Sequence, residues 1–169
     1  NGSGNVDINP SSNIDSDTIT FSAWVQSDLL SGARIIVNTG VGNVISYELG
    51  TVGNRILFWA RWSGYSGHWE TPAGSLVPGT WYHLAVTYDR RLSSNDPVIY
   101  MNGVPVQVIE SNSGPSGSAV TGQNHLRIGQ RVDSVQGFDG RIDEVRYYNH
   151  ILNQTEIQDD MNTAVGPAP

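Results

Sequence analysis

Cysteine, lysine and long apolar runs are absent from this chain of 169 residues, and each absence excludes a class of protein. Without cysteine there can be no disulfide, no thiolate metal site and no cysteine nucleophile. No apolar stretch approaches the ~20 residues of a membrane-spanning helix and no signal-peptide pattern opens the chain, so we expect neither feature. All nine basic residues are arginine, against sixteen acidic ones, and this net charge of −7 disfavours nucleic acid as a partner.

Glycine and proline are abundant instead, at nineteen and eight residues. Segments that alternate apolar and polar residues recur about every ten residues, between turn-forming clusters. This pattern predicts an all-β fold, a two-sheet antiparallel β-sandwich of the jelly-roll kind with at most a short C-terminal helix. A helix is expected from residue 151, with Asn153 as its N-cap, and a tight hairpin turn at Asn102-Gly103. The expected strands cover 5–9, 18–26, 34–38, 44–49, 55–62, 81–89, 98–106, 125–130 and 140–148.

The alternation also predicts which side chains face the core. In the strand over 18–26, the buried set is expected to be Ile19, Phe21, Ala23 and Val25. In the strand over 81–89 it is expected to be Leu84, Val86 and Tyr88. His83 and Thr87 then point outward, and we assign Trp24 and Trp81 to the core as large aromatics.

Four segments occur in the order typical of one family. They are FSAWV at 21–25, WYHLAVTYD at 81–89, IYMNGV at 99–104 and GRIDEVRYYN at 140–149. Together they resemble the laminin-G-like (concanavalin A-like lectin/glucanase) jelly-roll domain. The resemblance implies one domain over 1–165, with 166–169 as the start of a linker or tail.

The same resemblance implies a structural calcium ion. In the family, the aspartate of the Ile-Asp-Glu-Val motif is a calcium ligand, and here that residue is Asp143. Calcium takes six to eight oxygen ligands, many of them backbone carbonyls. We expect Asn1 and Gly2 to supply carbonyls. The alternative is that Asp143 makes a cap or an ion pair at a strand edge.

Residues 59–70 concentrate three of the five tryptophans beside a tyrosine, a histidine and an arginine. Sugar rings stack their C–H faces on aromatic rings, and their hydroxyls bond to planar or charged polar groups. The predicted carbohydrate-binding residues are Trp59, Arg61, Trp62, Tyr65, His68, Trp69 and Glu70. The alternative is that Trp62 and Trp69 close an edge of the sandwich, which leaves Trp59 exposed.

The sequence and the resemblance together favour a noncatalytic carbohydrate-binding module, secreted or at the cell surface, that binds a polysaccharide and brings a covalently linked catalytic domain to it. Neither nucleic acid nor a membrane is an expected partner. Glycoside hydrolysis needs a pair of carboxyl groups, and the closest acids, Asp139, Asp143 and Glu144, belong to the motif already assigned to structure. An enzyme is therefore not expected. The alternative from another class is a protein-binding adhesion or spacer domain of a cell-surface protein.

Overall fold

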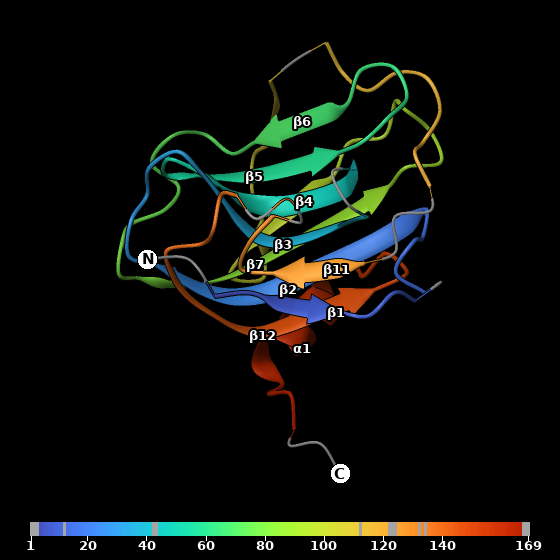
Figure 1. The fold of residues 1–169 in the computed structure, drawn as a ribbon. Coiled ribbons are helices and arrows are strands. Elements are labelled where there is room, and N and C mark those ends of the chain that lie inside the picture. The colour runs from blue at the N-terminus through green and yellow to red at the C-terminus, as the bar shows by residue number, and fades with distance from the viewer. Residues whose placement is uncertain are drawn as a thin grey trace.

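Two antiparallel sheets face each other in the computed structural model, which describes residues 4–11, 13–41, 44–111, 113–121, 125–131, 133 and 135–166 (Figure 1). The seven-stranded sheet has the order β1-β11-β3-β4-β5-β6-β10 and the five-stranded sheet has the order β12-β2-β7-β8-β9. The strands of the first are β1 (Val6–Ile8), β3 (Ala33–Val41), β4 (Val44–Val52), β5 (Arg55–Ala60), β6 (Gly67–Glu70), β10 (Ile109–Glu110) and β11 (Leu126–Ile128). Those of the second are β2 (Thr18–Ser27), β7 (Trp81–Asp89), β8 (Val98–Met101), β9 (Val104–Pro105) and β12 (Gly140–Tyr148).

The core lies between the sheets and is rich in aromatic rings. Phe58 and Trp69 from the seven-stranded sheet stack at 5.9 Å, and Trp69 meets Tyr88 of β7 at 5.3 Å. Contacts of this kind add about 0.5–1.5 kcal/mol per pair beyond the area that they bury. Each sheet therefore has one face inside the molecule and one outer face available for function.

The predicted fold class is confirmed, as are the two core sets of β2 and β7, all of whose members are buried. The hairpin turn is as expected, since Asn102 and Gly103 have φ values of 52° and 74°. The helix α1 (Gln154–Asn162) is N-capped by Asn153 in a full capping box with Glu156. The short strands β6 and β10 were not predicted.

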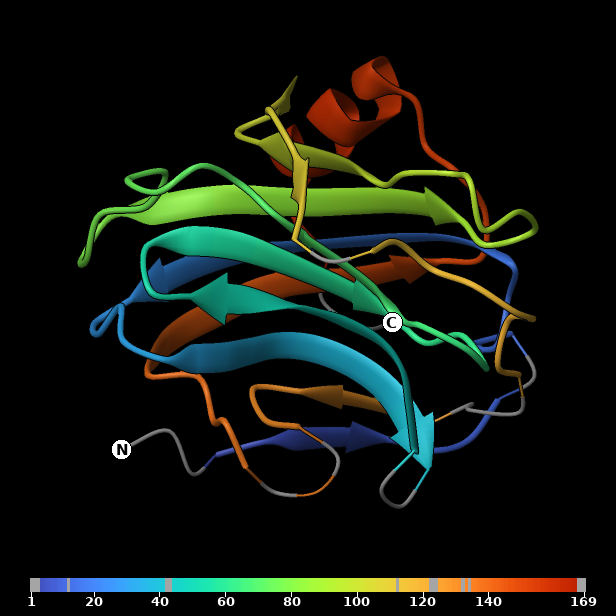
Figure 2. The ribbon, with the colours of Figure 1, turned by 90° about the horizontal axis from the view of Figure 1, so that it is seen from above.

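Helix α1 packs on the outer face of the five-stranded sheet, on the side away from the seven-stranded sheet (Figure 2). Ser22 of β2 donates to Asp160 at 2.6 Å, and His83 Nε2 of β7 lies 3.5 Å from the same carboxylate. His83 leaves the inter-sheet core as predicted, but the helix covers it completely.

The assignment of Trp24 and Trp81 to the core is wrong. Both indoles lie on the outer face of the five-stranded sheet, where Trp24 is partly buried and Trp81 is 38% exposed. The strand period explains the error, because both residues alternate with the core sets. The prediction relied on the large size of the two indole side chains, although the strand alternation places both on the outer face.

Within the described residues, no helix has the length and apolar character needed to cross a membrane.

Candidate functional site

A row of polar and aromatic side chains crosses the outer face of the seven-stranded sheet. Partners in an antiparallel ladder share a face, so the strand register identifies the row. Trp59 pairs with Glu48 on one side and with His68 on the other. Asn38 pairs with Glu48 on one side and with Arg127 on the other, and Arg127 in turn pairs with Asp7. We call these six residues the outer row: Asp7, Arg127, Asn38, Glu48, Trp59 and His68.

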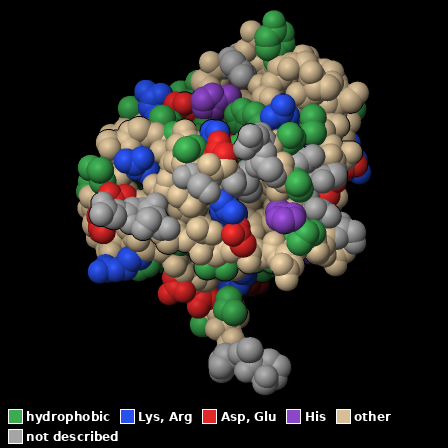
Figure 3. All heavy atoms as spheres, viewed as in Figure 1, with side chains coloured by type: hydrophobic (Ala, Val, Ile, Leu, Met, Phe, Trp, Pro, Cys, Tyr) green, Lys and Arg blue, Asp and Glu red, His purple; other side chains and the backbone are tan. Residues whose placement is uncertain are grey.

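The alternation along the strands places this row outside. Tyr47 and Leu49 flank Glu48 in β4 and belong to the core, as do Phe58 in β5 and Trp69 in β6. The face carries arginine, acidic and histidine side chains interspersed with apolar ones (Figure 3). Such a mixture offers both hydrogen-bonding groups and an aromatic ring to one ligand.

Glu48 lies at the centre of the outer row and is only 7% exposed. Its Oε1 is buried and accepts no hydrogen bond from the described residues, and Arg131 Nε lies 3.8 Å away. Burial raises the pKa of this carboxyl to about 7, an effect that Arg131 opposes and the Asp133 carboxylate reinforces. Glu48 can therefore carry a proton near neutral pH and act as a hydrogen-bond donor.

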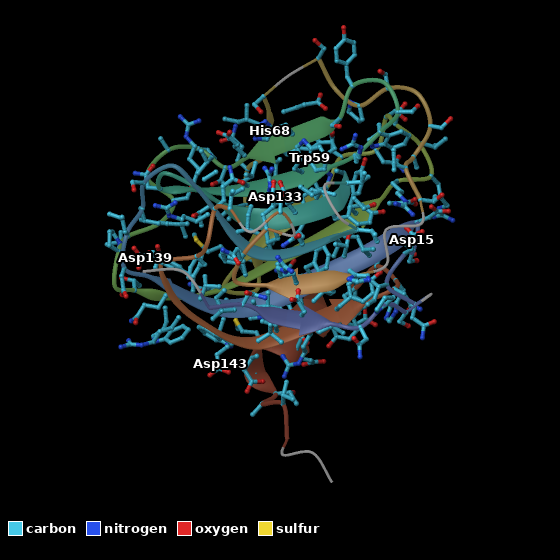
Figure 4. The ribbon with its side chains drawn as sticks, viewed as in Figure 1. Asp15, Trp59, His68, Asp133, Asp139 and Asp143 are labelled. Carbon is cyan, nitrogen blue, oxygen red and sulfur yellow. The ribbon has the colours of Figure 1, made fainter. Side chains whose placement is uncertain are left out.

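The segment that follows β11 runs over β3 beside Glu48. Asn38 Nδ2 donates to the Gln130 carbonyl at 2.7 Å, and the Ile35 amide donates to the Gln136 carbonyl at 2.9 Å. Arg131 Nε donates to Asp133 at 3.0 Å, and this contact holds the pKa of the Asp133 carboxyl below its usual range. Figure 4 shows Trp59, His68 and Asp133 over the upper half of this face.

His68 and Glu70 form one edge of the site. Arg55 Nη1 donates to Glu70 at 2.7 Å, and His68 Nε2 lies 3.3 Å from the other carboxylate oxygen. Glu70 is therefore held by two neighbours, while the His68 side chain keeps 35% of its surface exposed. Of the predicted set, the structure brings Trp59, His68 and Glu70 together.

Trp62 and Trp69 do not lie on this face, and the prediction that they offer exposed rings is wrong. They are 5% and 1% exposed, and each indole N–H has an internal acceptor, Tyr88 Oη at 3.2 Å and Asp96 Oδ1 at 3.0 Å. Trp69 folds over Gly67, where an added Cβ would lie 1.9 Å from its ring. Both rings are buried, as the alternative from the sequence requires, but Trp69 lies in the core between the sheets rather than at an edge, and Trp59 is only partly exposed.

Arg61 and Tyr65 follow β5 in the loop that leads to β6. Arg61 is partly buried, and its guanidinium makes no hydrogen bond to any residue that the structure describes. Tyr65 is 69% exposed, and its backbone is pinned to Ser116 by bonds of 2.9 and 3.0 Å. Arg61 therefore has donors to offer at the end of the strand that bears Trp59, whereas Tyr65 lies beyond the outer row.

The predicted calcium ligand lies elsewhere. Asp143 belongs to β12 in the five-stranded sheet, far from Trp59 (Figure 4), and its Oδ1 accepts the Glu144 amide at 2.8 Å. The described residues gather no group of three His, Asp or Glu side chains, and Asn1 and Gly2 lie outside them. Asp143 is the one predicted calcium ligand that lies within the described residues, and its carboxylate is exposed, so the calcium site stays a prediction.

Several residues of this face were missed by the sequence analysis. They are Asp7, Asn38, Glu48, Arg127, Arg131 and Asp133. The one local signal is the run Tyr47-Glu48-Leu49, in which an acid stands between core residues and must face outward. The others are brought together by strand register, which a single sequence does not specify.

Comparisons with known proteins agree with this architecture. A family model described as the concanavalin A-like lectin/glucanases superfamily matches residues 1–158. Over 89 residues the chain is 33% identical to pappalysin-1 of Mus musculus, a match that covers 53% of this chain and 5% of that protein. The chain thus spans a small part of this curated relative.

Two solved structures share the fold. A candidate carbohydrate-binding protein from Bacteroides ovatus ATCC 8483 has a TM-score of 0.67 at 19% identity, over 98% of this chain and 46% of that one. Domain 4 of AbnA, a GH43 extracellular arabinanase from Geobacillus stearothermophilus in complex with arabinotriose, has a TM-score of 0.61 at 20% identity, over 95% and 74%. At these identities the likeness shows the fold alone.

Proposed function

This chain belongs to the concanavalin A-like lectin/glucanases superfamily, and from that premise we propose that it is a noncatalytic module that binds a polysaccharide on the outer row. One observation carries the proposal. Trp59, a partly exposed indole, lies on the sheet surface with a buried carboxyl on one side and a histidine on the other. This arrangement suits a pyranose or furanose ring, because it combines a stacking surface with hydrogen-bonding groups at its edges.

The charges of the face favour a neutral glycan. Three arginines on or beside the outer row have an acidic partner: Arg127 pairs with Asp7 at 2.5 Å and Arg55 with Glu70 at 2.7 Å. Arg131 is held by Asp133 in the same way. Since these charges compensate one another, they give the outer row itself no excess of cations to select an acidic sugar.

One observation favours a second function, glycoside hydrolysis. The pKa of Glu48 is raised to about 7 and that of Asp133 is lowered, and such a divergence is typical of a catalytic acid and its partner carboxylate. Both oxygens of Asp133 accept from Arg131 Nε, so this carboxylate is occupied rather than free to attack a sugar. Binding without catalysis is therefore the stronger proposal.

Within a longer protein, the module would raise the concentration of a linked catalytic domain at its substrate, outside the cell. The carbohydrate-binding description of one structural neighbour and the arabinotriose complex of another support this proposal. An adhesion or spacer domain that docks a protein on the same face remains the alternative from another class.

The test is calorimetric titration of the domain with a panel of neutral polysaccharides. We expect Trp59→Ala to weaken binding by roughly tenfold or more, as when a central aromatic contact is removed, with no change in Tm. Trp81→Ala is the matched control, because it removes a partly exposed indole from the other sheet. Equal loss in both variants, or no glycan bound by the wild type, would refute the proposal.

The hydrolase alternative has its own assay. The wild type should release no reducing sugar from the polysaccharides that it binds. Release that disappears in Glu48→Gln would establish catalysis in place of simple binding.

A further inference from the structure

A hollow lies on the outer face of the five-stranded sheet, where α1 does not cover it. Its lining residues are Trp24, Trp81, Asp143 and Glu144, and its volume is about 260 Å³. We call this feature the indole hollow. None of these residues belongs to the outer row, which lies on the other sheet.

The two indoles occupy neighbouring strands on one face. Trp24 pairs with His83 and Gln26 pairs with Trp81, so the two tryptophans are diagonal neighbours across β2 and β7. Trp24 is fixed by a bond of 3.3 Å from its Nε1 to the Met161 carbonyl and by an edge contact with His83 at 5.5 Å. Trp81, at 38% exposure, is the more open of the two.

The acidic side of the hollow is shaped by a bulge in β12. The register with β2 shifts between Asp143 and Arg146, and Glu144 has a φ of 52°, which is rare for a residue other than glycine. The surrounding bonds impose this conformation, since Glu144 Oε2 accepts from Arg146 Nη2 at 3.1 Å and from the Val165 amide at 2.5 Å. Strained backbone of this kind is often kept where a side chain must be held for function.

The charge balance of the hollow is negative. Arg146 compensates Glu144, whereas Asp143 is exposed and accepts a hydrogen bond from the neutral Glu144 amide. The next cation along the strand, Arg141, donates to Gln26 Oε1 at 2.6 Å and does not line the hollow. Among the residues that the structure describes, Asp143 therefore has no cationic partner, and its carboxylate stands beside two indole rings.

We propose that the indole hollow binds an organic ammonium group, a cation that carries apolar substituents. Tryptophan is the aromatic side chain that attracts cations most strongly, and an alkylated ammonium loses little hydration when it meets an indole ring. The carboxylate of Asp143 supplies the complementary charge, and the net charge of −7 of the chain adds a long-range attraction. A neutral sugar could use the rings but would gain nothing from the uncompensated charge.

Choline chloride and 3,3-dimethylbutan-1-ol form a matched pair of probes, because they have the same shape and differ in charge. Each is titrated into the ¹⁵N-labelled domain at constant ionic strength with EDTA present, so that calcium at Asp143 plays no part. We expect choline to shift the indole N–H signals of Trp24 and Trp81 and to leave Trp59 unchanged. The uncharged alcohol should bind at least fivefold more weakly.

Variants separate this site from the fold and from the glycan site. Asp143→Asn should weaken choline binding about fivefold without a change in Tm, and Trp81→Ala should abolish it, whereas Trp59→Ala should bind choline like the wild type. Equal binding of the two probes would overturn the proposal, and so would glycan-induced shifts at Trp24 and Trp81 without any choline response. Co-sedimentation with phosphatidylcholine vesicles that is lost in Trp81→Ala would identify a lipid headgroup as the source of the ammonium group. Binding of choline without co-sedimentation would identify a small soluble ammonium compound as the ligand.

Discussion

Glu48 shows how one buried carboxyl links the fold of the seven-stranded sheet to its chemistry. Its pKa is raised to about 7 by burial, so between pH 4.5 and 7 the folded protein holds a proton that the unfolded chain has lost. Stability from this group is therefore greatest at low pH and is lost as pH rises through 7. Between pH 5 and pH 8 this loss is on the order of 2–3 kcal/mol.

We predict that the free energy of unfolding falls between pH 5 and pH 8 by that amount more in the wild type than in Glu48→Gln. Glutamine keeps the size of the side chain and cannot ionise, so the difference between the two proteins isolates this group from the histidines. Urea unfolding at both pH values is the measurement. Parallel pH profiles would show that Glu48 does not titrate in this range.

The tryptophans show what a sequence reveals about single residues. Trp59 was correctly placed outside because it alternates with Phe58, whereas Trp69 was misplaced although it stands between the outward-facing His68 and Glu70. The space that admits the Trp69 ring is left by Gly67, two residues earlier on the same face. Alternation could have identified Trp69 as buried, but the contact with Gly67 requires coordinates.

At the scale of elements, one carboxylate makes several of the contacts that hold α1 to the five-stranded sheet. Asp160 accepts from Ser22 at 2.6 Å and from Tyr148 at 2.5 Å, and Arg146 Nη1 lies 3.2 Å away. Burial acts to raise its pKa, but these partners and His83 outweigh burial and lower the pKa of Asp160 to about 2. The stability that Asp160 supplies is present above pH 4 and is lost as pH falls through 2.

We predict that Asp160→Asn lowers the free energy of unfolding by about 3 kcal/mol, because it removes the buried carboxylate that accepts from Ser22 and Tyr148 and leaves Arg146 with Glu144 as its remaining acidic partner. Asp159→Asn, an exposed neighbour on the same helix, should change stability by less than about 0.5 kcal/mol. Thermal unfolding near pH 7 gives both values. A similar small effect for the two substitutions would mean that Asp160 does not anchor the helix.

The elements differ in how far the sequence determined them. The N-cap at Asn153 and the Asn102-Gly103 turn are local, so residue type alone predicted both. Strands β6 and β10 have four and two residues, too few for a period to be recognised, and they form by pairing with each other and with β5. The bulge at Glu144 also depends on the neighbouring strand β2.

For the whole molecule, the two outer faces have different chemistry. The seven-stranded sheet presents compensated charges around Trp59, and the five-stranded sheet presents α1 on one part and the indole hollow on another. The β-sandwich could be predicted because regular strand spacing and family motifs are sequence properties. Which side chains share a face could not, because that depends on strand order and register.

The calcium prediction concerns the whole domain, because the ion is expected to join β12 to the N-terminal residues. If Asp143 is a ligand, millimolar calcium should raise the Tm of the wild type by several degrees relative to EDTA, as for any ligand that binds the folded state alone. Asp143→Asn should show no such difference. If the wild type has the same Tm in EDTA and in millimolar calcium, the prediction that the domain binds calcium is wrong.

The central claim is that a glycan lies across the outer row. The most direct measurement follows the five tryptophan indole N–H signals of the ¹⁵N-labelled domain during titration with a glycan that it binds. We expect the Trp59 signal to shift in a saturable way. The signals of the buried Trp62 and Trp69, and of Trp24 and Trp81 on the other sheet, should stay in place. A stationary Trp59 signal, with saturable shifts at any of the other four, would contradict it.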